Sequence, residues 1–412
     1  MSRRFGTPHA VRGSHPTAVP RAVASVEGDR VTAVELFFDL AYVFGFTQVS
    51  RLMADAHTAM GILRGLTVLA LLWWSWTAYS WLANQLHADE GFVRGAMFTG
   101  MTAVFVMAVM VPEAYADRTG GLSGPLIFVA AYLVARLTHL TVYMFTSVGG
   151  PAARREVVQT VCLSIVPSAA LLIGGALLGS PWQVWCVLTA VTVEPVIANL
   201  TTWGVRSRIS SATHFVERHR LVVILALGES TVAIGVGAGA IDIPPLAGVL
   251  LAMAIAIALW RAYFGEVATA AEHALCELDD RERSRAAHHG YTYLHLPIVA
   301  GIVLSALGIE TAMAHISGTG AYGLFGAVAL AGGAALYLVG TALFARRVVG
   351  AAMRPRLLAA LIMLTATPAL SPMPPLAALA TTAALLFGVL SLDRLSPISA
   401  PEAGRRSATH VA

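Results

Sequence analysis

The chain has 412 residues, of which 57% are hydrophobic and only 12% are charged, and its mean hydropathy is +0.71. Because an average soluble domain carries about 25% charged residues, this composition excludes a soluble globular protein. The apolar residues occur in runs of about twenty, the length that an α-helix needs to cross a hydrocarbon core about 30 Å thick. The sequence therefore predicts an all-α fold, a polytopic helical bundle that is integral to a membrane.

The basic residues and the cysteines limit the kinds of catalysis and of binding site that the protein can have. All 27 basic residues are arginine, which excludes lysine-dependent chemistry such as Schiff-base catalysis. Cys162, Cys186 and Cys276 lie far apart without C-x-x-C spacing, which indicates packing residues rather than a metal site or a disulfide framework. The formal charge of +4 is explained by membrane topology, so we expect no nucleic-acid partner.

The chain divides into two tails and a transmembrane domain. Residues 1–30 combine arginine with Pro, Ser and Gly and lack the apolar region of a secretory signal, which predicts a disordered cytoplasmic N-terminal tail. Residues 394–412 are expected to form a cytoplasmic C-terminal tail. Residues 31–393 form the expected transmembrane domain, with about twelve candidate spans at 33–53, 59–83, 94–112, 123–148, 158–179, 182–205, 214–238, 245–265, 290–312, 321–345, 355–370 and 374–392.

The arginine distribution predicts the orientation, because short cytoplasmic loops accumulate positive charge. With both termini in the cytoplasm, 20 arginines lie on the cytoplasmic side, whereas only Arg51, Arg64 and Arg118 lie outside. This asymmetry predicts an even number of spans. The 20 are Arg3, Arg4, Arg12, Arg21, Arg30, Arg94, Arg154, Arg155, Arg206, Arg208, Arg281, Arg283, Arg285, Arg346, Arg347, Arg354, Arg356, Arg394, Arg405 and Arg406.

The spans at 33–53 and 214–238 share a pattern that favours an internal duplication. Each has an acid at its cytoplasmic entrance and polar side chains three to four turns deeper, and each would be the first of six spans. A six-plus-six parallel duplication of this kind builds many transporters around a site between the halves. The matching residues are Glu35, Gln48 and Ser50 in the first span and Glu217, Glu229 and Ser230 in the second.

Glu35 and Asp39 are two carboxylates on one helical face, because they are four residues apart. Two such acids repel when both are ionised, so a cation must lie between them or one must hold a proton. The alternative for Glu35 is a solvated residue at the interface, which leaves only Asp39 to be neutralised. Ionisable groups at membrane depth are usually paired, and we expect Arg136 to bind Asp39 through its planar guanidinium.

The fourth span carries a polar stripe, since Tyr132, Arg136, His139 and Tyr143 follow at spacings of four, three and four residues. For His139 the favoured alternative is a core residue whose ring bonds a backbone carbonyl. The stripe nevertheless places Arg136 and His139 in a predicted substrate or ion pathway.

The seventh span begins with a charged cluster at its cytoplasmic entrance, formed by His214, Glu217 and Arg218. A salt-bridged helix end is the alternative interpretation of this cluster. Glu229 lies eleven residues after Arg218, about 16 Å along the axis, so the two cannot pair directly. Glu229 is therefore expected to find a partner on another helix or to be protonated.

The ninth span contains His295 two residues before Pro297, which removes a backbone hydrogen bond and predicts an irregular helix where a cavity is lined. No carboxylate or cysteine has ligand spacing with the nearby histidines, so no metal site is predicted. The tryptophans at 73, 74, 76 and 81 are interpreted as interfacial and packing residues. The complete predicted pathway consists of Glu35, Asp39, Arg136, His139, Glu229, His295 and Glu310.

Several sequence blocks resemble the bacterial low temperature requirement A (LtrA) family. They cover roughly residues 30–390 in family order, and the resemblance implies a multi-spanning protein of the bacterial inner membrane. One block departs from the family pattern, because the family tends to have Asn-Arg-Phe and acids where this chain has Asn84 to Glu90, which puts any ligand of that loop in doubt. The matching blocks are Val34 to Leu40, Asn84 to Arg94, His214 to Arg218, Leu227 to Ser230, Tyr293 to Pro297 and Gly308 to Glu310.

Three functions remain open from the sequence, none with an assigned cofactor. The favoured one is a transporter or permease of a small-molecule or lipid substrate, with proton coupling through the buried acids. A membrane-embedded enzyme acting on a lipid or isoprenoid-like substrate is the alternative, with Asp39, Glu229 and His295 as acid and base groups. The third is a structural protein for membrane adaptation to cold.

The predicted topology is tested by reporter fusions. Fusions after residues 155 and 285 should report the cytoplasm, and a fusion after residue 118 should report the exterior, because the arginine-rich loops remain inside. An exterior signal after residue 285 would overturn the orientation.

Overall fold

The computed structural model describes residues 25–117, 121–146, 150–201, 208–237 and 242–394. The regular structure of these residues is helical, and they contain no β-strand element, as the all-α prediction requires. Most of both predicted tails, together with Arg118 and Arg206, lies outside the described residues.

Eight helical segments within the described residues are long and apolar enough to cross a membrane. Each of the twelve predicted ranges overlaps a helix. The four helices outside the group of eight are either shorter, as 17-residue α15 is, or interrupted by charged side chains, as α1 and α8 are. A helical bundle with membrane-spanning helices is therefore the observed architecture. The eight segments are Ala59–Gln85, Gly91–Val109, Gly124–Phe145, Arg154–Leu178, Ile243–Glu277, Asp280–Ala314, Leu324–Val348 and Pro375–Asp393.

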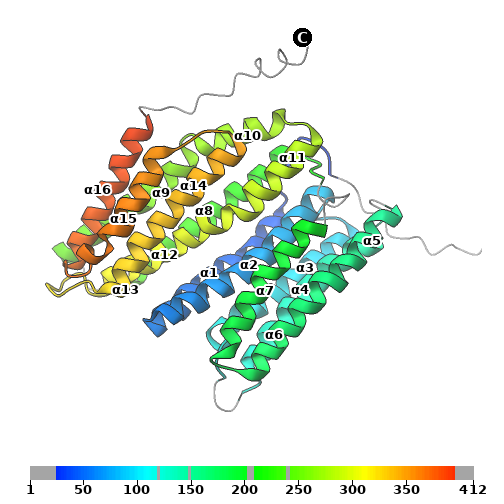
Figure 1. Ribbon diagram of the computed structural model, residues 1–412, viewed down its shortest axis with the longest axis horizontal. Helices are drawn as coiled ribbons and strands as arrows, with labels where there is room; N and C mark the ends of the chain where they lie inside the picture. Colours follow the sequence, from blue (N-terminus) through cyan, green and yellow to red (C-terminus); the bar gives the residue numbers. More distant parts are fainter. Residues whose placement is uncertain (1–24, 118–120, 147–149, 202–207, 238–241, 395–412) are drawn as a thin grey trace, which may run out of the picture.

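The first helices form an N-terminal helical group (Figure 1). In it α1 packs against α2 and α3, α3 packs against α4, α4 against α6, and α6 against α7, which returns to α2. The bounds are α1 Ala33–Ala56, α2 Ala59–Gln85, α3 Gly91–Val109, η1 Val111–Glu113, α4 Gly124–Phe145, α5 Gly150–Thr160, η2 Val161–Ile165, α6 Val166–Leu178 and α7 Trp182–Thr201.

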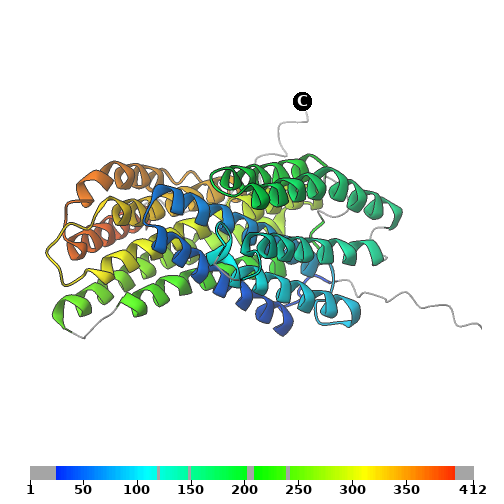
Figure 2. The same cartoon turned by 90° about the horizontal axis from the view of Figure 1, so that it is seen from below.

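The remaining helices form a C-terminal helical group on the other side of the molecule (Figures 1 and 2). The two groups meet where α1 and α2 contact α8 and α12, and this contact is called the junction below. The bounds are α8 Ala212–Gly237, α9 Ile243–Phe264, α10 Val267–Glu277, α11 Asp280–Ala286, η4 Ala287–Tyr293, α12 His295–Ala314, α13 Leu324–Ala327, η5 Val328–Gly332, α14 Gly333–Val348, α15 Arg354–Leu370 and α16 Pro375–Arg394.

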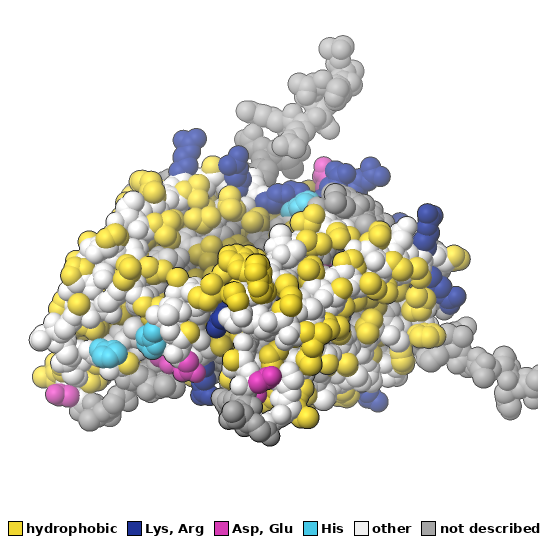
Figure 3. All heavy atoms as spheres, turned by 60° about the horizontal axis from the view of Figure 1, so that its bottom comes forward, with side chains coloured by type: hydrophobic (Ala, Val, Ile, Leu, Met, Phe, Trp, Pro, Cys, Tyr) yellow, Lys and Arg dark blue, Asp and Glu magenta, His cyan; other side chains and the backbone are white. Residues whose placement is uncertain are grey.

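The outer surface of the bundle is apolar between its two ends. Large exposed side chains such as Phe37, Phe105, Leu177, Leu250 and Leu361 come from helices of both groups. Figure 3 shows this apolar belt, with most arginines in view along its upper edge and acidic and histidine side chains toward the lower edge. Such a belt is the surface expected of helices embedded in lipid.

Pro297 predicts a kink just after His295, but the irregular segment of this span is the π-helical η4, which ends at Tyr293, before α12 begins at His295. Proline has no N–H, so the carbonyl of Thr292, which lies five residues earlier at π-helical spacing, needs another donor. The indole N–H of Trp73 on α2 donates to it at 2.7 Å. Trp81 donates to the Thr292 hydroxyl at 2.9 Å, so the irregular turn is held by the neighbouring helical group.

Close backbone packing of α12 against α14 and η5 depends on glycine. A Cβ on Gly308 would lie 2.5 Å from the backbone N of Leu330, and a Cβ on Gly301 would lie 2.5 Å from the backbone N of Tyr337. Small residues allow such approach between membrane helices.

We expect Gly308→Ala to lower the free energy of unfolding by about 1–3 kcal/mol, because the added methyl group would push two backbones apart. The matched control is Gly174→Ala on α6, where a Cβ meets nothing within 4 Å. Thermal unfolding of the detergent-solubilised variants would measure both effects. Equal midpoints for the two variants would contradict the close packing.

Candidate functional site

A buried ion pair joins the two helical groups near the N-terminal ends of α1 and α8. The Arg218 guanidinium donates to Asp39 Oδ1 at 2.9 Å, and both side chains are 0% exposed. The Trp76 indole N–H on α2 donates to the same oxygen at 2.9 Å, and the Arg218 guanidinium lies over the Trp76 ring at 5.6 Å. A residue of the predicted pathway and a residue of the predicted entrance cluster therefore form one site.

Glu35 belongs to the same site and is buried, so it is not the solvated interfacial residue of the alternative interpretation. Its Oε2 accepts from the backbone N–H of Thr32 at 2.7 Å and completes a capping box at the start of α1. Its Oε1 lies 3.0 Å from His214 Nε2 and 3.8 Å from Arg218 Nη1. One carboxylate thus caps α1 and binds two side chains of α8. Glu35, Asp39, Trp76, His214 and Arg218 are called the inner charge network.

The predicted pairing of Asp39 with Arg136 is wrong. Arg136 donates from Nε and Nη2 to Glu194 Oε1 of α7, at 3.0 and 2.6 Å, and Tyr132 donates to Glu194 Oε2 at 2.6 Å. Arg136 reaches to α7 rather than to α1. The polar stripe of α4 therefore holds the N-terminal helical group together.

Glu229 is bound from α1, as expected for a buried acid without a partner on its own helix. Thr47 Oγ lies 2.7 Å from Glu229 Oε2 and 3.3 Å from the carbonyl of Val43. Glu229 is 4% exposed. It lies toward the opposite end of α8 from Arg218, so the junction has polar contacts at both ends.

The remaining pathway residues occupy different surroundings. His139 packs against the rings of Tyr79 and Tyr143, and Glu310 on α12 is half-buried. Glu217, the third member of the predicted entrance cluster, is exposed, and its carboxylate accepts from the backbone N–H of Val31 at 3.4 Å. The cluster therefore divides, because His214 and Arg218 face the junction and Glu217 does not.

His295 lies in a separate aromatic group at the junction. Its Nδ1 is 3.2 Å from the carbonyl of Gly290, so Nδ1 carries the proton, and the Tyr263 hydroxyl donates to Nε2 at 2.8 Å. His219 likewise donates from Nδ1 to the Phe215 carbonyl at 2.9 Å. Both rings are fully buried. The bonding pattern is that of two neutral imidazoles.

The loop that departs from the family pattern fastens α2 to the start of α8. Asn84 donates to the carbonyl of Ser211 at 2.6 Å and accepts from the backbone N–H of Ser210 at 2.9 Å. His87 pairs with Asp29 at 3.5 Å. In this structure the loop makes structural contacts between the C-terminal end of α2 and the N-terminal end of α8.

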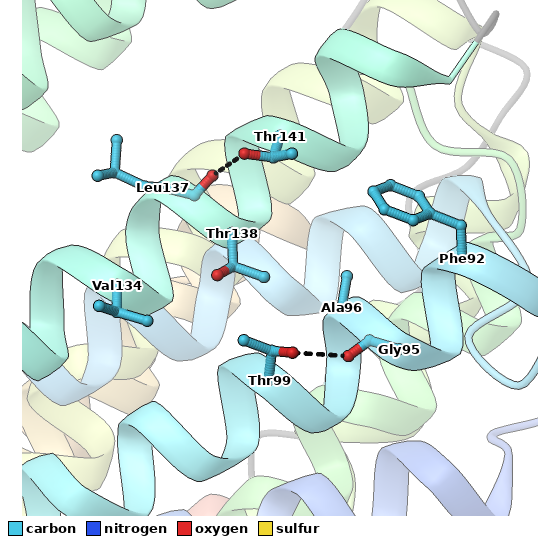
Figure 4. A pocket seen from close by; sticks show the side chains of 8 residues that line it. All are labelled: Phe92, Gly95, Ala96, Thr99, Val134, Leu137, Thr138 and Thr141. Atoms are coloured by element: carbon cyan, nitrogen blue, oxygen red, sulfur yellow. Dashed lines mark hydrogen bonds between the residues drawn. The ribbon is translucent and has the colours of Figure 1, made fainter.

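In the part of the chain that the structure describes, neither a metal-binding group nor the surface groove between α3 and α4 involves these residues. Within the described ranges, no group of three His, Cys, Asp or Glu side chains could hold a metal ion. A groove of about 470 Å³ lies on the outer surface between α3 and α4 (Figure 4). Its Thr99 and Thr141 hydroxyls donate to carbonyls of their own helices, so the groove presents an apolar lining.

Three polar residues of these sites were not identified from the sequence. Trp76 was assigned to packing, and Glu194 and Thr47 were not singled out. Of the three, only Thr47 could have been found from the sequence. It lies 182 residues before Glu229, and the same separation relates Glu35 to Glu217.

The chain is similar in sequence to known proteins. The family model for the bacterial low temperature requirement A protein (LtrA) matches residues 30–391. The chain belongs to the LtrA family. It is also 29% identical over 320 residues to an uncharacterized protein of Rhizobium meliloti (strain 1021), covering 74% of this chain and 75% of that protein. No solved structure matches this LtrA protein.

A double-mutant cycle tests the observed pairing. Asp39→Asn and Arg218→Gln should each lower the free energy of unfolding by about 3–5 kcal/mol, because each leaves a buried charge without its partner. The loss of unfolding free energy in the double variant should be smaller than the sum of the two single losses by at least about 1 kcal/mol. Denaturant unfolding of the solubilised protein is the measurement.

The matched cycle combines Asp39→Asn with Arg136→Gln, which share no hydrogen-bond partner. Their effects should add to within about 0.5 kcal/mol. Coupling in this second cycle, or its absence in the first, would reject the assignment of partners.

Proposed function

We propose that this LtrA protein is an ion-coupled transporter in which Glu229, at the junction of two related halves, carries the coupling proton. The observation that carries the proposal is the hydrogen bond between Glu229 of α8 and Thr47 of α1. It places a buried carboxylate between the two helical groups, where transporters built from repeats bind substrates and coupling ions.

The pattern of helix neighbours supports a six-plus-six duplication with twelve spans. In the N-terminal helical group, α1 contacts α2 and α3, and α3 contacts α4. In the C-terminal helical group, α8 contacts α9 and α12, and α12 contacts α14. The remaining contacts also correspond. In the N-terminal helical group α4 contacts α6, α6 contacts α7, and α7 contacts α2. In the C-terminal helical group α14 contacts α15, α15 contacts α16, and α16 contacts α9. Two chains of six helices with the same neighbours are what a parallel duplication would produce.

The sequence separations agree with this proposal. The Val-Glu pairs that open α1 and α8, at residues 34 and 216, are 182 residues apart, and Thr47 and Glu229 are separated by the same 182 residues. Equivalent positions of two parallel repeats meet at the axis that relates them. Glu229 would then lie on the axis about which the halves rock.

The geometry around Thr47 suits a carboxyl group that gains and loses a proton. A hydroxyl has a single proton, yet Thr47 Oγ lies near two acceptors, the Val43 carbonyl and Glu229 Oε2. When Glu229 is ionised, Thr47 donates to it. When Glu229 is protonated, its own O–H donates to Thr47, and Thr47 donates to Val43. The hydrogen bond between Thr47 and Glu229 is therefore kept in both protonation states, and only the donor and the acceptor exchange roles.

The embedded-enzyme alternative is disfavoured by the positions of its proposed groups. Arg218, which binds Asp39, and Glu229 are about 16 Å apart along α8, too far for Asp39 and Glu229 to act on one substrate atom. His295 is engaged by Tyr263 and the Gly290 carbonyl. No observation favours the structural role in cold adaptation over transport.

We place the protein in the bacterial inner membrane with cytoplasmic termini. Arginines in the last turns of α11 and α14, at positions 283, 285, 346 and 347, support this orientation. Glu35 and Arg218 would then be near the cytoplasm and Glu229 near the exterior.

Proton movement in proteoliposomes tests the proposal. With a pH-sensitive dye inside the vesicles, one or more members of a panel of amino acids, sugars and nucleosides should drive proton flux in the native protein. Glu229→Gln should abolish the flux, because an amide cannot carry the proton.

The matched control is Glu90→Gln, which neutralises an exposed acid with no side-chain bond at the start of α3 and should retain the flux. Equal flux in Glu229→Gln and the native protein would reject Glu229 as the proton carrier. Turnover of a lipid substrate that is lost in Asp39→Asn or His295→Ala would favour the enzyme.

A further inference from the structure

Oxygen atoms from two helices gather at the outer end of the junction. Thr47 and Ser50 are three residues apart on α1 and therefore share a helical face. Ser50 is 2% exposed. Its hydroxyl lies within hydrogen-bonding reach of the carboxylate of Glu229, which Thr47 also contacts at 2.7 Å. Two hydroxyls of α1 therefore converge on one buried acid.

The surroundings of this group have an excess of negative charge. Glu310 of α12 interacts electrostatically with Glu229, and Arg51 of α1 acts on both acids. Asp55 and His57, which follow on α1 and at its end, also act on Glu310. Beside the His57 ring, three carboxylates, those of Glu229, Glu310 and Asp55, face a single guanidinium, and Arg51 is exposed to solvent. The group therefore favours a cation.

We propose that Glu229, Thr47 and Ser50 form a Na⁺ site at the junction, an inference that rests on the proposed transport function and names its second coupling ion. Carboxylate and hydroxyl oxygens are hard ligands of the kind that bind alkali and alkaline-earth cations. A single buried carboxylate matches a single positive charge, whereas Ca²⁺ sites use more carboxylates and six to eight oxygens. The site is thus assigned to a monovalent ion.

The three side chains can present lone pairs to the ion at the same time. Thr47 donates its proton to the Val43 carbonyl, 3.3 Å away, which leaves its oxygen free on the side of Glu229. The Ser50 hydroxyl can rotate its proton away from the ion and present its oxygen. Ionised Glu229 supplies the charge. Na⁺ engages the oxygens of all three groups at once, whereas a proton binds only the carboxyl group, so the two ions compete for one carboxylate.

The test is thermal unfolding of the purified full-length protein in detergent, followed by circular dichroism. At constant ionic strength and neutral pH, replacing choline chloride by NaCl should raise the midpoint, because an ion that binds only the folded state stabilises it. The effect should weaken at acidic pH as protons displace Na⁺. Ser50→Ala should increase the NaCl concentration needed for half of the shift by about tenfold or more, since an ion ligand is lost.

The matched control is Ser168→Ala on α6, which removes another buried hydroxyl, away from Glu229. Its NaCl dependence should equal that of the native protein. Glu229→Gln should remove the shift. If that variant does not fold, the Ser50→Ala titration decides alone. A shift that is the same with KCl or choline, or that Ser50→Ala leaves unchanged, overturns the site.

The outcome separates this inference from the proposed function. Proton flux that requires Glu229 without any Na⁺-specific shift would leave the transporter standing and reject the Na⁺ site. A Na⁺-specific shift that requires Ser50 and Glu229, without solute-driven flux, would establish the ion site and count against transport.

Discussion

The Arg218–Asp39 pair is the contact on which the junction depends. A guanidinium and a carboxylate, both 0% exposed, are held at 2.9 Å between α1 and α8. Removing either partner would leave an uncompensated charge in a low dielectric, which is far more costly than the loss of an exposed pair. The geometry also fixes the register of α8 against α1. A shift of one turn would separate Arg218 from Asp39 and His214 from Glu35 together.

The two ends of the junction differ in strength. The inner charge network ties three helices through hydrogen bonds and ion pairs, and residues 25–31 contact α2 and α8 through the side chains of Ser25 and Glu27 and the backbone N–H of Val31. At the outer end, α1 and α8 are joined through Thr47 and Glu229. The inner end is held by attraction between opposite charges, because the Arg218 guanidinium lies beside the carboxylates of Asp39 and Glu35. The outer end is held by a hydrogen bond between a hydroxyl and a carboxyl group.

The sequence predicted well which segments are helical and which charged residues are buried, but it predicted poorly which charged side chains bind each other. Apolar runs located helices at all twelve ranges, and Pro297 indicated the span that contains the π-helical segment η4 but not its position. The burial of Asp39, Arg136 and Glu229 also followed from their place in apolar runs. The choice of Arg136 as the partner of Asp39 failed, because charge and depth alone cannot distinguish arginines on different helices. Helix neighbours decide that choice, and residues 58 and 179 positions apart meet only in three dimensions.

The tryptophans of α2 give the junction an optical property. Trp73 and Trp76 stack at 5.0 Å, and their indole N–H groups bond to a carbonyl of η4 and to Asp39, both outside α2. The emission of an indole responds to its hydrogen bonds and to nearby charge. Movement between the helical groups would change the hydrogen bond of Trp73 to η4 and the distance of Trp76 from the Arg218 guanidinium of α8. Intrinsic fluorescence can thus report such movement without an added label.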